Sequence, residues 1–186
     1  MKKRELISYF NELAETRDWW KKRNRYYHQT VENLCKFIVP PDSFVVEVGS
    51  GTGDLLNVLK PKYGLGVDIS SKMVEIARIK YPRLSWQVGD AENLSITERF
   101  DYIIMSDILG YLEDVEKSFL CLKKISNEHS RIVITYYNYF WEPLLRLAEF
   151  LCLKAKQPIQ NWLSPQDMEN LLYLSGFEVV KKGNKL

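Results

Sequence analysis

The sequence contains the stretch Val45-Val46-Glu47-Val48-Gly49-Ser50-Gly51-Thr52-Gly53-Asp54, in which an apolar run leads into a glycine-rich turn. Glycines at alternate positions allow a tight turn and a close approach of the backbone to a ligand, because no Cβ intervenes. A helix that starts after such a turn directs its unpaired N–H groups toward the same ligand. The stretch therefore predicts a buried strand, a ligand-binding turn and a helix.

The size and charge of the chain set the first limits. A chain of 186 residues has the length of one domain with a single good core. Within it we expect an N-terminal helical cap over residues 1–39 and an α/β domain over residues 40–186. The net charge is only +2, so nothing at the level of the whole chain indicates a nucleic-acid partner.

The cysteines and the hydropathy pattern indicate the compartment. Cys35, Cys121 and Cys152 are far apart and each lies in apolar sequence, which favours free buried thiols over a disulfide framework. The start of the chain lacks the pattern of a signal peptide, and no run of 18 apolar residues occurs. We therefore expect a cytoplasmic protein without a spanning helix.

The first 25 residues are the most basic part of the chain, with eight basic and four acidic side chains. Residues 5–38 follow a helical pattern, in two pieces. The plainer interpretation of the basic residues is the solvated face of an amphipathic helix. Contact with an anionic acceptor or with a membrane surface is the alternative.

Short apolar runs alternate with helical patterns in the rest of the chain. Continuous apolar runs are typical of strands that are buried on both faces of a sheet. The six expected strands are 44–48, 63–67, 84–88, 100–105, 131–136 and 177–181, and the helices between them are expected near 53–59, 70–81, 114–125, 143–154 and 164–176. This alternation predicts a single Rossmann-like α/β/α sandwich with a mostly parallel sheet.

Acidic residues follow several of the expected strands. Asp68, Asp90 and Asp107 come directly after the second, third and fourth strands, and the glycine turn comes after the first. In a parallel sheet, ligands bind beyond the carboxyl ends of the strands. The sequence therefore predicts one site at this edge.

The choice of cofactor depends on the acids around the glycine turn. Asp68 lies 19 residues after Gly49, where a carboxylate can accept ribose hydroxyls, but a nicotinamide-binding fold would place an acid there too. Position 54 is Asp, where a dinucleotide fingerprint expects a third glycine, and a pyrophosphate beside Asp54 and Glu47 would meet repulsion. Glu47 instead suits a ligand with an ammonium or sulfonium group, and Asp90 could accept from an adenine amine.

Four segments of the chain resemble the successive motifs of class I S-adenosylmethionine-dependent methyltransferases: 46–53 (VEVGSGTG), 66–70 (GVDIS), 88–94 (VGDAENL) and 100–107 (FDYIIMSD). The resemblance covers roughly residues 40–137. It implies that the glycines line the methionine moiety near Glu47, that Asp68 holds the ribose with Ile69 on the adenine, and that Asp90 and Ala91 contact the adenine amine. The cofactor set that we predict is Tyr27, Glu47, Gly49, Ser50, Gly51, Gly53, Asp68, Ile69, Met73, Asp90, Ala91, Glu92, Ser106 and Asp107.

The chain departs from the resembled family at its end. Family members usually insert a seventh, antiparallel strand between the fifth and sixth, whereas this sequence stops at Leu186, just after the expected sixth strand. Without that strand the fifth strand would expose an apolar edge. We therefore expect a truncated chain or a piece of a longer one, with low stability or a homodimer as the consequence.

Three residues are candidates for the methyl-transfer chemistry. His28 could act as a general base, although a lone histidine is more often structural. Asp107 could take the same role or cap a helix. Tyr27 could donate a hydrogen bond to the cofactor carboxylate.

The segment after the fifth strand could form the acceptor pocket. Residues 136–141 include five aromatic side chains, which could line the pocket or pack under the next helix. That helix, 143–154, has a broad apolar surface that could join the core or contact a membrane interface or a lipid-linked acceptor. No histidine pair or Cys-x-x-Cys has ligand spacing, so we expect no metal.

The sequence thus predicts a methyltransferase that acts on an oxygen or nitrogen of a small molecule, a sugar or a lipid-linked acceptor, with S-adenosylhomocysteine as product. Two alternatives remain open at this point. One is an NAD(P)-dependent oxidoreductase, and the other is a non-catalytic module that works through a partner protein or a membrane.

Overall fold

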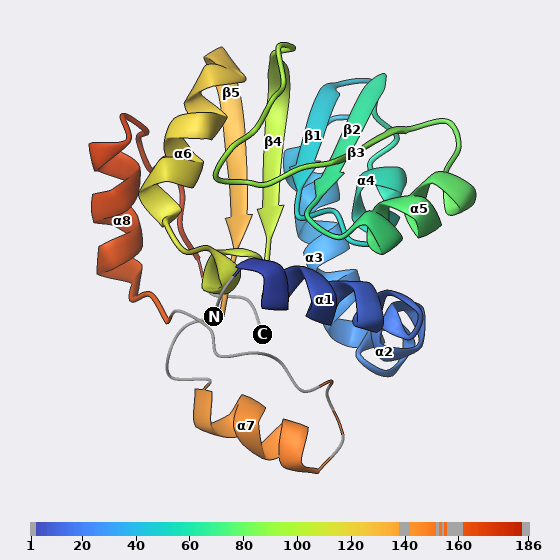
Figure 1. Ribbon diagram of the computed structural model, residues 1–186. Helices are drawn as coiled ribbons and strands as arrows, with labels where there is room; N and C mark the ends of the chain where they lie inside the picture. Colours follow the sequence, from blue (N-terminus) through green and yellow to red (C-terminus); the bar gives the residue numbers. More distant parts are fainter. Residues whose placement is uncertain (1–2, 138–141, 152, 154, 156–161, 184–186) are drawn as a thin grey trace.

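The computed structural model describes residues 3–137, 142–151, 153, 155 and 162–183. Its centre is a sheet of five parallel strands in the order β3-β2-β1-β4-β5 (Figure 1). The strands are β1 Phe44–Val48, β2 Tyr63–Asp68, β3 Ser85–Val88, β4 Phe100–Ser106 and β5 Ser126–Thr135. The predicted α/β fold with a mostly parallel sheet is confirmed.

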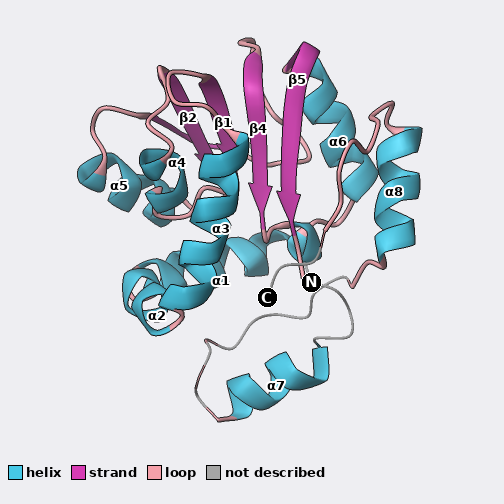
Figure 2. Ribbon diagram, turned by 180° about the vertical axis from the view of Figure 1, so that it is seen from behind, coloured by secondary structure: helices cyan, strands magenta, loops and turns pink. Residues whose placement is uncertain are grey.

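Helices cover both faces of this sheet (Figures 1 and 2). One face packs against α3 (Arg25–Ile38), α4 (Asp54–Val58) and α5 (Ser71–Lys80) through a core that includes Val45 and Ile104. The other packs against α6 (Val115–Lys124) and α8 (Pro165–Leu174) through a core that includes Phe119. Successive strand residues point to opposite faces, so the apolar runs fill both cores.

The N-terminal segment forms three helices, where the sequence predicted two pieces. α1 (Lys3–Ala14) and α2 (Arg17–Arg23) cross the carboxyl edge of the sheet, and α3 then runs along one face toward the amino ends of the strands (Figure 2). The breaks lie near Thr16 and Asn24, and neither of these residues caps the following helix with its side chain. We call the segment Lys3–Arg23, which comprises α1 and α2, the strap.

The end of the chain differs from the sequence prediction. Ser164 caps the start of α8 in a capping box with Asp167, as the sequence pattern predicts. Residues 177–183 form no strand, so the predicted sixth strand over 177–181 is wrong. An apolar run makes a strand only where another strand offers it a ladder of hydrogen bonds, and the structure assigns 177–183 no such partner.

The remaining predicted elements differ mainly at their ends. β5 starts five residues earlier than predicted, because a register shift between Phe100 and Tyr102 lets Ser126 pair with Phe100. α7 (Glu142–Phe150) ends earlier than predicted and lies beyond the carboxyl ends of the strands (Figure 1). The aromatic residues 138–141 lie outside the described residues.

The structure also tests the predictions about the cysteines and about a membrane-spanning helix. Cys35 and Cys121 are buried free thiols, as predicted, and Cys152 lies outside the described residues. In the part of the chain that the structure describes, no helix is both long and apolar enough to cross a membrane.

Candidate functional site

The glycine turn after β1 has the backbone conformation that its sequence predicts. Gly49, Gly51 and Gly53 have φ values of 80°, 52° and 84°, in the left-handed region that favours glycine. A Cβ at Gly49 would lie 2.0 Å from Ile108, and a Cβ at Gly53 would lie 2.2 Å from Trp86. A Cβ at Gly51 would meet only the Arg17 Nε atom at 3.9 Å, so Gly51 alone turns its free face toward the strap.

Asp68 ends β2 and joins the glycine turn to the next helix. Its Oδ2 atom accepts from the backbone N–H of Gly51 at 2.8 Å, and its Oδ1 atom accepts from that of Ser70 at 2.9 Å. Burial raises the pKa of this carboxyl, although both N–H groups favour the charged form. A carboxylate has about four acceptor positions, so Asp68 retains capacity for further donors such as hydroxyls.

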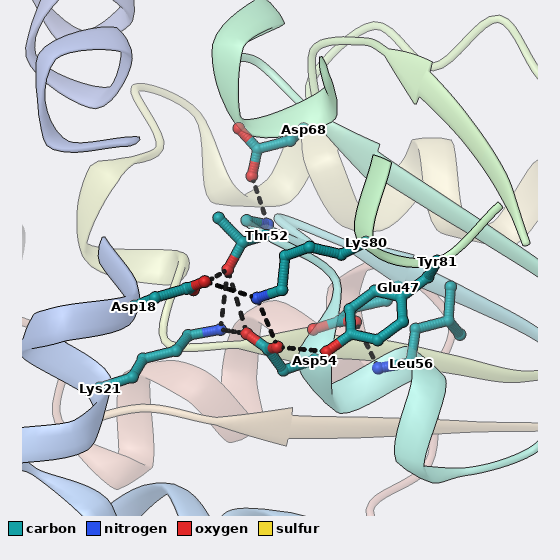
Figure 3. A network of polar contacts seen from close by, with 10 residues as sticks. Asp18, Lys21, Glu47, Thr52, Asp54, Leu56, Asp68, Lys80 and Tyr81 are labelled. Atoms are coloured by element: carbon teal, nitrogen blue, oxygen red, sulfur yellow. Dashed lines mark hydrogen bonds and ion pairs between the residues drawn. The ribbon is translucent and has the colours of Figure 1, made fainter. Parts of the chain in front are cut away.

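Glu47 is buried beneath the same turn, with 3% of its surface exposed. Its Oε2 atom accepts from the backbone N–H of Leu56 in α4 at 3.0 Å (Figure 3). Burial raises the pKa of the Glu47 carboxyl, while the nearby Lys21 charge opposes that shift. A nearby cation therefore favours the charged form of this carboxyl.

Asp54 is held by cations from two helices (Figure 3). Its carboxylate lies 2.5 Å from Lys21 Nζ in the strap and 2.8 Å from Lys80 Nζ in α5, and it accepts from the Tyr81 hydroxyl at 2.6 Å. Burial alone would raise the pKa of Asp54, but the lysines and Tyr81 hold it well below its usual range. Two lysines therefore balance the charge of Asp54 in this structure.

Asp90 and Glu92 lie in the turn after β3, and both bind the strap. Lys3 Nζ lies 2.6 Å from Asp90 Oδ2 and 3.1 Å from Glu92 Oε2. The second oxygen of each carboxylate accepts a backbone N–H, from Glu92 for Asp90 and from Glu113 for Glu92. Between them, Ala91 packs against the core.

The other predicted cofactor residues lie at the same edge with different degrees of burial. Ile69 is partly buried, whereas Met73 is 2% exposed and belongs to the core. The Ser106 hydroxyl lies 3.0 Å from that of Thr135. The Ser50 hydroxyl is buried and has no hydrogen-bond partner among the described residues.

Asp107 follows β4 and contacts two other elements. It accepts from the Tyr27 hydroxyl at 2.6 Å and from the Thr135 hydroxyl at 3.1 Å. The short helix η1 (Leu109–Tyr111) that follows has no side-chain cap, so the alternative in which Asp107 caps a helix is not supported. Burial and the Asp107 charge hold the pKa of Tyr27 well above its usual range, so Tyr27 stays protonated as the donor.

Two further aromatic rings pack against Tyr27. The Tyr27 ring stacks on the Tyr137 ring, with centroids 5.3 Å apart, and meets the His28 ring edge-on at 5.4 Å. Burial, together with the charges of Lys21 and Arg17, lowers the pKa of His28 to about 4. His28 is therefore a neutral imidazole near pH 7.

A cavity of about 50 Å³ lies between these groups, beside Glu47, Gly49, Asp107 and His28. Arg17 and Lys21 of the strap also line it. Lys3, Arg17 and Lys21 were not among the predicted site residues, since basic residues on an N-terminal helix have the same sequence pattern whether they face solvent or a carboxylate. The one available signal was the spacing of four residues between Arg17 and Lys21, which places both on one helix face.

The fold and the acidic, glycine-rich strand ends define the class I S-adenosylmethionine-dependent methyltransferase type. The family described as methyltransferase domain matches residues 19–182. The chain therefore belongs to this methyltransferase family, which confirms the resemblance found in the sequence and gives S-adenosylmethionine as its cofactor. The family also favours this cofactor over the nicotinamide alternative.

The curated relatives share less than 30% of their residues with this chain. The chain is 29% identical over 143 residues to a malonyl-[acyl-carrier protein] O-methyltransferase of Priestia megaterium, which covers 73% of this chain and 52% of that protein. It is 27% identical over 160 residues to a demethylmenaquinone methyltransferase of Thermotoga maritima, which covers 73% of this chain and 70% of that protein. The chain spans about half the length of the first curated relatives that it matches.

Among solved structures, magnesium protoporphyrin IX methyltransferase from Synechocystis PCC 6803, with bound S-adenosylhomocysteine, is similar to this chain. The TM-score is 0.79 at 20% identity, and the match covers 98% of this chain and 92% of that one. At this identity the likeness supports the fold alone.

Proposed function

We propose that this protein transfers a methyl group from S-adenosylmethionine to an oxygen or nitrogen atom of a small-molecule, sugar or lipid-linked acceptor. The observation that carries the proposal is the gathering of Glu47, Asp68 and Asp90 at the carboxyl ends of neighbouring strands, around the glycine turn. This arrangement of acceptors suits the ammonium, ribose and adenine amine of the cofactor.

The residues that are present fit that cofactor. The backbone at Gly51 has an open face, the Ser50 hydroxyl is buried without a partner among the described residues, and Asp68 has acceptor capacity left. Asp68 would hold the ribose hydroxyls, Glu47 would lie near the ammonium, and Asp90 would accept from the adenine amine. Ile69 would pack on the adenine. Met73 belongs to the core, so any contribution from it would be indirect.

When bound, S-adenosylmethionine supplies a methyl group on a positively charged sulfonium. The chain itself contributes His28 and Asp107, which line the cavity, and Tyr27, which contacts both of them, so an acceptor could be positioned beside this group. Positioning of this kind supplies much of the rate in a displacement reaction. His28 lines the cavity as a neutral imidazole, so its ring can accept a hydrogen bond from an acceptor hydroxyl. A pKa of about 4 makes it a weak base, so its contribution would be to orient the hydroxyl more than to remove its proton.

The proposal names the chemical class of the acceptor and not a particular molecule. The malonyl-[acyl-carrier protein] and demethylmenaquinone methyltransferases bear names that point to very different acceptors. The aromatic side chains of Tyr27, Tyr137 and His28 near the cavity favour an acceptor with an apolar body. The exposed Leu147, Phe150 and Leu151 of the α7 region would allow peripheral contact with a membrane. The proposal includes a cytoplasmic location, no metal and no nucleic-acid partner, and it allows a homodimer.

Thermal unfolding with S-adenosylhomocysteine, with NADH as the control ligand, tests the first half of the proposal. A ligand at 100 times its dissociation constant stabilises the folded state by about 2.7 kcal/mol, which is easily seen as a shift in midpoint. A shift with NADH alone would contradict the proposal. Transfer of a labelled methyl group to a panel of hydroxyl and amine acceptors then tests turnover, and tight binding without turnover on any acceptor would favour a non-catalytic module.

A further inference from the structure

One side of α2 faces away from the cavity. Arg17 and Lys21 line the cavity, and their spacing of four residues places them on the same side of the helix. The positions on the other side of α2, and the first positions of α3, are exposed and carry two aromatic and three basic side chains: Trp19, Lys22, Arg23, Arg25 and Tyr26. We call these five residues the basic-aromatic patch.

The patch exposes large rings and uncompensated positive charge to water. Trp19 is 52% exposed, and the Arg23 guanidinium lies over its ring, 5.2 Å from the centroid. The acids that precede the patch, Asp18 and Glu15, pair with lysines of α5. In the described part of the chain, no basic residue of the patch forms an ion pair with a carboxylate. A negatively charged partner can therefore neutralise this surface.

α7 and the turn after it expose an apolar side at the same end of the molecule. The exposed apolar side chains have helical spacing, at Leu147, Phe150 and Leu151. α7 and the strap both lie beyond the carboxyl ends of the strands (Figure 1). Burial raises the pKa of Tyr9 in α1 to about 12, and the charges of Arg17 in α2 and Glu149 in α7 also act on it. The apolar side of α7 therefore lies near the strap.

This combination of side chains matches the surface of an anionic bilayer. Lysine and arginine are attracted to anionic head groups, tryptophan and tyrosine lie at the level of the head groups, and aliphatic side chains enter the acyl boundary. A nucleic acid would also attract the basic residues and stack on the rings, but it gains nothing from the aliphatic side of α7. The observations therefore favour a lipid surface.

We propose that the basic-aromatic patch and α7 dock this protein on an anionic membrane surface, and that the methyl acceptor is a molecule held in that membrane. α2 connects the two statements, because one of its sides lines the cavity and the other carries the patch. The lipid surface then lies about 10 Å, one helix diameter, from the cavity. The statement about the acceptor rests on the proposed function, whereas the docking does not.

Sedimentation with vesicles tests the docking. The probes are vesicles of phosphatidylcholine alone and of phosphatidylcholine with an equal amount of phosphatidylglycerol. We expect binding to the mixed vesicles that added salt weakens, and little binding to the neutral ones. The double variant Lys22→Gln, Arg23→Gln should lower the partition constant about 30-fold, because each charge near the surface contributes to binding. The matched control is Lys117→Gln with Lys124→Gln, which removes the same charge from exposed positions of α6 and should leave binding nearly unchanged.

Phe150→Ala tests the contribution of α7. Loss of an aromatic side chain that enters the bilayer should weaken binding to the mixed vesicles about ten-fold. Phe37→Ala is the control, because Phe37 is as exposed as Phe150 but lies near the end of α3, toward the amino ends of the strands. If the double variant and Phe150→Ala both bind like the wild type, the docking is overturned. Binding of a single-stranded oligonucleotide in place of the mixed vesicles overturns it as well.

A matched pair of acceptors tests the second statement. Each hydroxyl or amine acceptor is offered in water and as a long-chain derivative embedded in the mixed vesicles. We expect faster transfer to the embedded form, and the double variant should lose this advantage while its rate on the acceptor in water stays unchanged. Equal rates on both forms overturn the membrane-held acceptor. If the protein binds vesicles but not S-adenosylhomocysteine, the proposed function fails and the docking stands, whereas the opposite result overturns the docking alone.

Discussion

The Tyr27 hydroxyl donates to the Asp107 carboxylate at 2.6 Å, and this bond joins α3 to the carboxyl end of β4 across 80 positions of the sequence. Asp107 has a φ of 58°, a left-handed conformation that residues other than glycine adopt at a cost. Its backbone N–H donates to the Thr135 carbonyl and its carboxylate accepts from the Thr135 hydroxyl. A strained backbone conformation that several hydrogen bonds stabilise is typical of functional positions.

Tyr27→Phe tests what this pair does. The variant retains the ring stacked on Tyr137 but loses the donor to Asp107. We expect the rate of methyl transfer to fall about ten-fold because the acceptor is less well positioned, while the dissociation constant of S-adenosylhomocysteine stays within about two-fold. Tyr26→Phe, at an exposed neighbouring position, should change neither quantity. A rise in the dissociation constant alone would instead assign Tyr27 to the cofactor carboxylate.

Asp68→Asn tests the ribose position. An amide offers one acceptor oxygen where the carboxylate has two, and its charge is lost, so we expect the dissociation constant of S-adenosylhomocysteine to rise about ten-fold. Asp101→Asn is the matched control, since Asp101 also accepts a backbone N–H but lies at the amino end of the sheet. Unchanged affinity in a folded Asp68→Asn protein would show that the ribose lies elsewhere.

Substitution of two glycines by alanine separates packing from ligand access. Gly53→Ala forces a Cβ into Trp86 at a positive φ, and we expect a loss of about 3 kcal/mol in the free energy of unfolding. Gly51→Ala meets no atom closer than 3.9 Å, so we expect a loss of about 1 kcal/mol from backbone strain alone. Urea denaturation measures both losses, and equal losses would contradict the assignment of Gly51 as the open position.

The pH dependence of stability tests the environment of His28. Because burial and the neighbouring cations lower its pKa from 6.5 to about 4, the unfolded chain binds a proton between these values and the folded chain does not. Stability therefore falls as the pH drops from 6.5 toward 4, by at most about 3 kcal/mol from this residue. His28→Asn should flatten the slope of unfolding free energy over this range. Identical slopes for the two proteins would show that the pKa of His28 is not lowered in the folded state.

Local sequence patterns were sufficient for the glycine turn, the acids at the strand ends and the buried strands. Positive φ at Gly49, Gly51 and Gly53 follows from residue type and spacing, and the apolar runs of β1 and β4 follow from burial on both faces. Residues 177–181 show where this reasoning fails. Their apolar pattern favours extended backbone, but a ladder needs a neighbouring strand that no local pattern supplies.

The sequence by itself determined the fold class and the class of ligand, because strand periodicity, glycine conformation and carboxylate chemistry act over a few neighbouring residues. Only the tertiary structure decided which distant groups meet. It paired Lys3 with Asp90 and Glu92, and Tyr27 with Asp107, across some eighty residues or more. A basic residue in a helix has the same local pattern whether it faces water or a carboxylate, and packing of the strap across the sheet edge decides between the two.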